Sequence, residues 1–128
     1  MTRRRNDEAA LQRAVISHLE ARAHPRVTWW HTPSSSTLGG RRTQTGVPFE
    51  AIRLKRLGFK PGIPDLSFVH NGRYFGLELK TKKGRPTAAQ MEFASNINAS
   101  GGAATIAYDL DTALRTLETW GLLKGSSM

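Results

Sequence analysis

Residues 64–80 read PDLSFVHNGRYFGLELK, and this segment predicts a β-hairpin at the centre of the protein. Its middle, Asn71-Gly72, is typical of a two-residue type I′ turn, because both residues tolerate a positive φ angle. Apolar residues alternate with polar or small ones on both sides of the turn. Such alternation is the pattern of strands that bury one face.

The turn also predicts how the two strands pair. With Asn71-Gly72 as the loop, Phe68 faces Phe75 and Leu66 faces Leu77. These four side chains then lie on one face of the hairpin and give it a consistent apolar surface. The register therefore predicts which side of the hairpin is packed against the core.

The same register places charged residues together on the other face. Asp65 is predicted to lie opposite Glu78, and two carboxylates in directly opposed positions destabilise a strand pair. Lys80 follows two residues after Glu78 and so lies on the same face. Two acids and one amine on one patch favour a bound cation. Because carboxylate oxygens are hard ligands, that cation is expected to be Mg²⁺ or Mn²⁺.

The composition sets limits on the type of protein. The chain has 128 residues, of which 38% are hydrophobic, enough for one domain spanning residues 1–128 with a modest core. Residues 1–6 are expected to form a flexible basic leader and residues 124–128 a frayed tail. Without cysteine there is no disulfide framework or thiolate metal site. No signal peptide or membrane-spanning run is evident, so we expect an intracellular protein with no membrane partner.

Positive charge is concentrated around the predicted hairpin. The formal net charge is +9, and most of the excess falls within residues 38–85. Such clustering favours binding to phosphates, although a basic surface can also serve only for solubility. The candidate DNA-binding residues are Arg41, Arg42, Arg53, Lys55, Arg56, Lys60, Lys82, Lys83 and Arg85.

The remaining elements predict an α/β fold. Periodicity and end signals indicate these elements around the hairpin: a helix at about 7–23, a strand at 26–31, a short basic helix at 49–57, a helix from 86–87 to about 100, a strand at 103–108, and a last helix from 109 or 111 to about 120. This order predicts a mixed β-sheet with a central hairpin, flanked by helices. Residues 32–46 show no periodicity and are expected to form a mobile loop that becomes ordered on DNA.

Two residues have competing interpretations. Thr87 and Gln90 match the capping box Thr-x-x-Gln, which explains Gln90 as a helix-start residue; alternatively, its side chain points toward the charged patch. His31, at the end of a predicted strand, is either structural or able to reach a phosphate or water at that patch.

Several of these segments resemble a known nuclease family. Pro64-Asp65, followed by Glu78-Leu79-Lys80, resembles the core motif of the PD-(D/E)XK nucleases. Together with the leading helix, Gly62-Ile63, Gly84-Arg85-Pro86-Thr87 and Gln90, the pattern is similar to the VRR-NUC branch of that superfamily, in particular its stand-alone, phage-type members. The likeness extends over about residues 7–123.

The resemblance implies a restriction-endonuclease-like core and a metal-dependent endodeoxyribonuclease. Asp65, Glu78 and the Leu79 carbonyl would bind the metal, and Lys80 would orient the attacking water or stabilise the transition state. Gln90 and Glu8 would position the water and the hydration shell of the metal. The small members of the family imply a homodimer that cuts branched DNA such as four-way (Holliday) junctions, in the cytoplasm or nucleoid of a bacterial or phage-infected cell.

Two other classes of function remain open. One is a basic nucleic-acid-binding module without catalysis, in which Asp65 and Glu78 are ordinary hairpin residues. The other is a regulator or assembly protein that dimerises through Trp29, Trp30 and the C-terminal helix. Salt-dependent binding to DNA would separate the second class from the other two.

Overall fold

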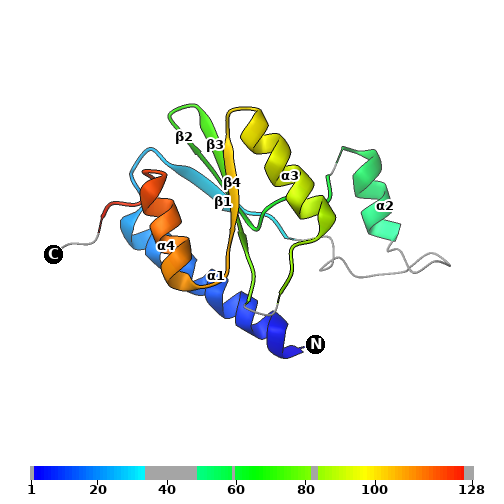
Figure 1. Cartoon of the computed structure of the whole chain (residues 1–128), viewed down its shortest axis with the longest axis horizontal. Helices are drawn as coiled ribbons and strands as arrows, with labels where there is room; N and C mark the ends of the chain where they lie inside the picture. The colour runs from blue at the N-terminus through cyan, green and yellow to red at the C-terminus, as the bar shows by residue number, and fades with distance from the viewer. Residues whose placement is uncertain (1, 34–48, 59, 82–83, 126–128) are drawn as a thin grey trace.

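The protein folds around one four-stranded sheet (Figure 1). The structure is a computed structural model that describes residues 2–33, 49–58, 60–81 and 84–125. Its elements are α1 (Thr2–Arg22), β1 (Thr28–His31), α2 (Phe49–Arg56), β2 (Leu66–His70), β3 (Arg73–Leu79), α3 (Ala88–Ala99), β4 (Ala103–Ala107) and α4 (Leu110–Thr119).

The strand order is β1-β2-β3-β4. β1 and β2 are antiparallel, as are β2 and β3, whereas β4 runs parallel to β3. Helices α1 and α4 lie on one side of the sheet, and α3 packs beside β4 on the other (Figure 1). The predicted α/β fold, a mixed sheet with a central hairpin flanked by helices, is therefore confirmed.

The predicted hairpin register is also confirmed. Phe68 pairs with Phe75, and Leu66 pairs with Leu77. The loop residues Asn71-Gly72 have φ angles of 53° and 76°, the left-handed conformations that a type I′ turn requires. The turn therefore sets which hairpin residues face the core and which face the charged patch.

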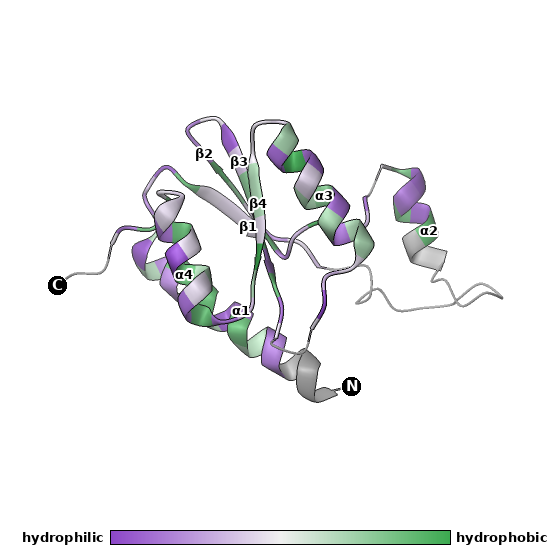
Figure 2. Cartoon of the chain, in the orientation of Figure 1, coloured by the Kyte–Doolittle hydropathy of each residue, from purple (hydrophilic) through white to green (hydrophobic). Residues whose placement is uncertain are grey.

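The main core lies between the sheet and the pair of helices α1 and α4. Figure 2 shows both helices banded with hydrophobic and hydrophilic residues, as expected for helices that bury one face. The apolar face of the hairpin supplies the sheet side of this core. The buried cluster consists of Val15, Leu19, Leu66, Phe68, Phe75, Leu77, Leu79, Ala107, Ala113, Leu117, Leu122 and Leu123. Trp29 packs against it, whereas Trp30 is 43% exposed.

Both ends of the described chain differ from the sequence prediction. The backbone is helical from Thr2, so residues 2–6 extend the first helix rather than forming a separate leader. Arginine is a good helix former, and no glycine or proline interrupts this segment.

At the other end, Lys124 is not frayed. Its N–H donates to the Arg22 carbonyl at 2.8 Å, and its own carbonyl accepts from the Arg22 guanidinium at 2.7 Å. The same guanidinium pairs with Glu118, which ties the chain end to α1 and α4. Residues 126–128 of the predicted tail lie outside the described residues.

Within the described residues, none of the helices combines the length and the apolar character needed to cross a membrane.

The position of the core predicts that truncating two different leucines will have very different effects on the free energy of unfolding. Leu77 is fully buried, so Leu77→Ala should lower the free energy of unfolding by about 2–5 kcal/mol. Leu57 is 72% exposed, and Leu57→Ala should change it by less than about 0.5 kcal/mol. Urea denaturation of both variants measures the contrast; equal losses would contradict the position of the core.

Candidate functional site

Asp65 lies at the point where the hairpin ladder ends. The paired residues of β2 and β3 stop at Leu66 and Leu77, so the N–H of Leu79 has no β2 carbonyl opposite it. The carboxylate of Asp65 takes this place, since its Oδ2 accepts the Leu79 N–H at 2.8 Å. On its other side, the Asp65 carbonyl accepts the N–H of Thr32 at 2.9 Å. Asp65 therefore links β3, through its carboxylate, to the residue that follows β1, through its carbonyl.

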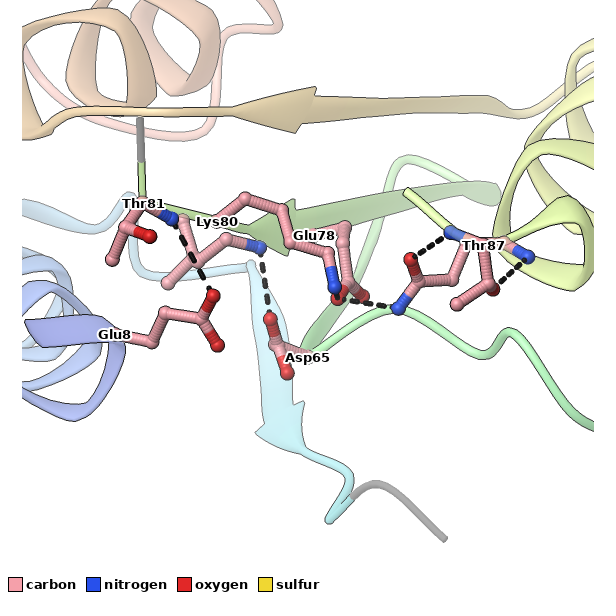
Figure 3. Close-up of polar contacts among 8 residues, drawn as sticks. Glu8, Asp65, Glu78, Lys80, Thr81 and Thr87 are labelled. Carbon is pink, nitrogen blue, oxygen red and sulfur yellow. Dashed lines mark hydrogen bonds and ion pairs between the residues drawn. The ribbon is translucent and has the colours of Figure 1, made fainter. Parts of the chain in front are cut away.

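Glu78 is the buried member of the charged patch. It is 7% exposed and is the one buried charged residue among those that the structure describes. Its Oε2 accepts a hydrogen bond from the Gln90 side-chain amide at 2.8 Å and lies 3.8 Å from the Lys80 ammonium nitrogen. Figure 3 shows Glu78 and Lys80 together at the end of β3, beside Asp65. The predicted convergence of two acids and one amine is present.

The two carboxylates are held in an environment that disfavours their charge. Burial, followed by the nearby negative charge of Asp65, raises the pKa of Glu78 to about 8. Burial likewise raises the pKa of Asp65, against the lowering effect of its bond from the Leu79 N–H. Lys80 favours the charged form of both acids but does not offset these effects. The surroundings that the structure describes therefore favour protonation of this pair relative to carboxyl groups in water.

Gln90 both caps α3 and contacts the charged patch, the two roles that were alternatives in the sequence analysis. Its Oε1 accepts the Thr87 N–H at 2.9 Å, and Thr87 Oγ1 accepts the Gln90 N–H at 3.0 Å, which completes the capping box at the start of α3. The remaining amide group, Nε2, donates to Glu78 (Figure 3). The two interpretations do not compete, because an amide carries an acceptor and a donor on different atoms.

Gly62 allows the loop before Asp65 to lie against this helix start. Its φ angle is 86°, and a Cβ placed there would be 2.3 Å from the Ala89 carbonyl oxygen and 2.8 Å from the Gln90 nitrogen. A side chain at this position would separate the loop from α3. Glycine is therefore required for the close approach that sets Gln90 beside the charged patch.

Glu8 reaches the patch from α1. Its Oε2 accepts the Thr81 N–H in a long contact of 3.5 Å, and a Cβ on Gly84 would lie 3.2 Å from the same oxygen. Its charge contributes to raising the pKa values of both Asp65 and Glu78, although as the smallest of the causes. The structure thus brings Glu8 to the edge of the patch.

The donor set fits a hard divalent cation. Among the residues that the structure describes, no three Asp, Glu or His side chains form a group able to hold a metal ion. The protein contribution would be the carboxylates of Asp65 and Glu78, with the Leu79 carbonyl between them in the chain. Mg²⁺ is usually bound by one or two carboxylates, with waters and substrate phosphates completing its shell, so two acids are sufficient.

The predicted DNA-binding residues fall into two groups. Arg53, Lys55 and Arg56 form the basic last turn of α2 and are exposed, as are Lys60 and Arg85 in the segments before Asp65 and before α3. The other four, Arg41, Arg42, Lys82 and Lys83, lie outside the described residues, as does most of the predicted mobile loop.

One contact at the site involves a residue that sequence reasoning missed. Gln12 Nε2 lies 3.0 Å from His31 Nδ1, and the same ring nitrogen lies 3.0 Å from the Asp65 carbonyl oxygen. Gln12 follows Glu8 by one helical turn, so the two share a face of α1. That spacing is the signal in the sequence that would have suggested a role for Gln12.

Comparison with known proteins supports the fold. No family model matches the chain, and no curated protein is similar to it at a significant level. Among solved structures, the chain is similar to one described as a "VRR_NUC domain protein", with a TM-score of 0.67 and 21% sequence identity. The match covers 88% of this chain and 86% of the other. The protein therefore has the α/β fold of that structure.

The raised pKa of Glu78 predicts how stability varies with pH when no metal is present. Because the pKa rises from 4.5 to about 8 on folding, the folded protein binds more protons than the unfolded chain between these values. The free energy of unfolding should therefore fall as the pH rises through this interval, and Asp65 should act in the same direction. Thermal melts in EDTA measure this dependence.

Glu78→Gln should flatten this decline in the free energy of unfolding with pH. Glu92→Gln, at an exposed position of α3, should leave the decline unchanged. An equally steep decline in Glu78→Gln would show that another group is responsible.

Proposed function

We propose that this protein is a metal-dependent endonuclease that hydrolyses phosphodiester bonds in DNA. The observation that carries the proposal is the buried Glu78 beside Asp65 and Lys80, at the end of the central hairpin. When both groups are ionised, two adjacent carboxylates with raised pKa values destabilise the folded protein. Their arrangement is explained if they bind a cation that a phosphate substrate also contacts.

The proposed reaction joins a water oxygen to phosphorus and breaks one ester P–O bond of the DNA backbone, with one water proton passing through solvent to the departing ester oxygen. A bound Mg²⁺ or Mn²⁺ ion would polarise the phosphate and favour deprotonation of the water. The oxygens of Asp65 and Glu78 would hold that ion. The Lys80 ammonium, already close to Glu78, would donate to the attacking water or to a phosphate oxygen as negative charge develops there.

Gln90 and Glu8 would have supporting roles. Gln90 fixes the orientation of the Glu78 carboxylate through its amide, and the capping box in turn fixes the Gln90 amide. A side chain bonded at both ends keeps a single rotamer, which is what a ligand needs from its neighbours. Glu8 would accept a hydrogen bond from water at the edge of the site, since its carboxylate lies near Thr81.

For the substrate, we propose branched DNA such as a four-way junction, cut by a homodimer. The support is the similarity of the motifs around Asp65, Glu78 and Gln90 to stand-alone, phage-type VRR-NUC proteins. Basic residues on α2 and next to the site provide contacts for phosphates. Such a substrate implies work in the cytoplasm or on the nucleoid. A binding module without catalysis is the alternative, but it gives no reason to bury Glu78 beside Asp65.

The proposal predicts the loss of cleavage without the loss of binding. Asp65→Asn, Glu78→Gln and Lys80→Ala should each slow cleavage by about 100-fold or more, the scale on which a group that stabilises a transition state acts. Cleavage of linear, flapped and four-way DNA in Mn²⁺ measures the rate, and a gel-shift assay measures binding.

Glu92→Gln serves as the matched control, because it removes an exposed acid from α3. Cleavage by the wild type in excess EDTA, or full activity of Glu78→Gln, would refute the proposed chemistry.

A second prediction concerns the path of DNA. Lys60 and Arg85 are exposed and lie in the segments that lead to Asp65 and to α3. If each contacts one phosphate, Lys60→Ala and Arg85→Ala should each reduce the slope of log affinity against log salt by about 0.9. Their melting temperatures should stay near that of the wild type, because exposed charges contribute little to stability.

Arg115→Ala is the control. This exposed arginine is on α4, which lies on the other side of the sheet from α3. Titrations at several salt concentrations test the set. Unchanged slopes for Lys60→Ala and Arg85→Ala would mean that DNA approaches from another direction.

A further inference from the structure

The side chain of His31 lies against the backbone of Asp65. His31 is the last residue of β1 and pairs with Leu66, which places its ring beside the preceding residue, Asp65. Its Nδ1 is 3.0 Å from the Asp65 carbonyl oxygen and 3.0 Å from the side-chain amide of Gln12. Both hydrogen bonds that the described residues make to this ring therefore involve the same nitrogen.

The contact with the Asp65 carbonyl determines the tautomer of the ring. A carbonyl oxygen can only accept, so Nδ1 must carry the proton if its contact with Asp65 is attractive. Gln12 must then present its oxygen rather than its NH₂ group to Nδ1, an exchange that leaves the shape of the amide unchanged. The other assignment would place two lone pairs against each other at the Asp65 carbonyl. The Nδ1–H tautomer is the one that satisfies both contacts.

This arrangement fixes Asp65 from three directions. The Asp65 carbonyl accepts from both the Thr32 N–H and the His31 ring, and its carboxylate accepts from the Leu79 N–H. The Thr32 and Leu79 groups belong to the backbone and are supplied by any sequence with this fold. The His31 ring is the one side-chain donor to Asp65 among these contacts.

We propose that His31, in the Nδ1–H tautomer that its contact with the Asp65 carbonyl requires, is a positioning residue that orients Asp65 toward Glu78. The inference rests on the proposed nuclease function for its biological meaning, since Asp65 is there assigned to hold the metal. The hydrogen-bonded unit itself is a property of the chain alone. Helix α1 thereby acts on the site through Glu8 and, one turn later, through Gln12.

The tautomer can be measured without metal or DNA. The ¹⁵N chemical shifts of the His31 ring, recorded at about pH 8.5, where an ordinary imidazole is neutral, distinguish a protonated Nδ1 from a protonated Nε2. We expect protonated Nδ1 in the wild type. Protonated Nε2 would overturn the proposal, because the ring could then not donate to the Asp65 carbonyl.

Two substitutions separate the ring nitrogens. The side-chain amide of His31→Asn places a donor near the position of Nδ1, whereas that of His31→Gln reaches only the position of Nε2. Affinity for Mn²⁺ alone, measured by the electron paramagnetic resonance of the ion, should fall about tenfold in His31→Ala and in His31→Gln, the usual size of an outer-shell effect. His31→Asn should stay within about threefold of the wild type. Gln12→Leu should weaken binding in the same direction, by less than His31→Ala.

Controls make each outcome decisive. His18→Asn changes another histidine on α1 and should leave Mn²⁺ affinity unaltered, and thermal melts confirm that each variant is folded. Equal affinities for all His31 variants, or an equal loss in His31→Asn and His31→Ala, would overturn the role given to Nδ1. If the wild type itself does not bind Mn²⁺, the proposed nuclease function fails, while the ring tautomer still decides whether His31 holds Asp65.

Discussion

The main physical constraint on this structure is the burial of one carboxylate, that of Glu78, beside a second one, that of Asp65. An ionised group that is 7% exposed costs free energy unless opposite charge and hydrogen bonds surround it. Here the Gln90 amide and the Lys80 ammonium supply part of this compensation, and the raised pKa of Glu78 shows that it is incomplete. The cation proposed above would supply the remainder.

The elements around this pair have separate tasks. The hairpin brings Asp65 and Glu78 together and directs its apolar residues to the opposite face, where α1 and α4 cover them. Helix α3 begins at a capping box whose glutamine is also bonded to Glu78. Helix α1 contributes to the core in its second half and approaches the charged patch in its first, through Glu8 and Gln12. Thus the core and the site are built from the same helices and strands, on opposite sides of the sheet or at its end.

At this site, polar side chains continue the hydrogen bonding of the sheet beyond the last paired residues of its strands. Where the β2–β3 ladder stops, the Asp65 carboxylate replaces a main-chain acceptor for Leu79, and the His31 ring adds a second donor to a carbonyl that Thr32 already satisfies. The first of these bonds restricts rotation of the Asp65 carboxylate, and the others fix the backbone from which it extends. A rigid ligand loses less entropy when it binds an ion or a phosphate, which is why these bonds at the end of the sheet are relevant to the proposed hydrolysis.

The sequence by itself determined the hairpin, its register and the meeting of Asp65, Glu78 and Lys80, because a two-residue turn and a period of two leave one arrangement of neighbours. It also located the cap at Thr87, which depends on residues three apart in the chain. Only the tertiary structure decided that Gln90 caps its helix and bonds Glu78 at once, and that Gln12 meets His31. It also showed that the chain end at Lys124 is anchored to Arg22. Each of these contacts joins segments distant in sequence, and its geometry is set by how helices pack on the sheet, which local patterns do not encode.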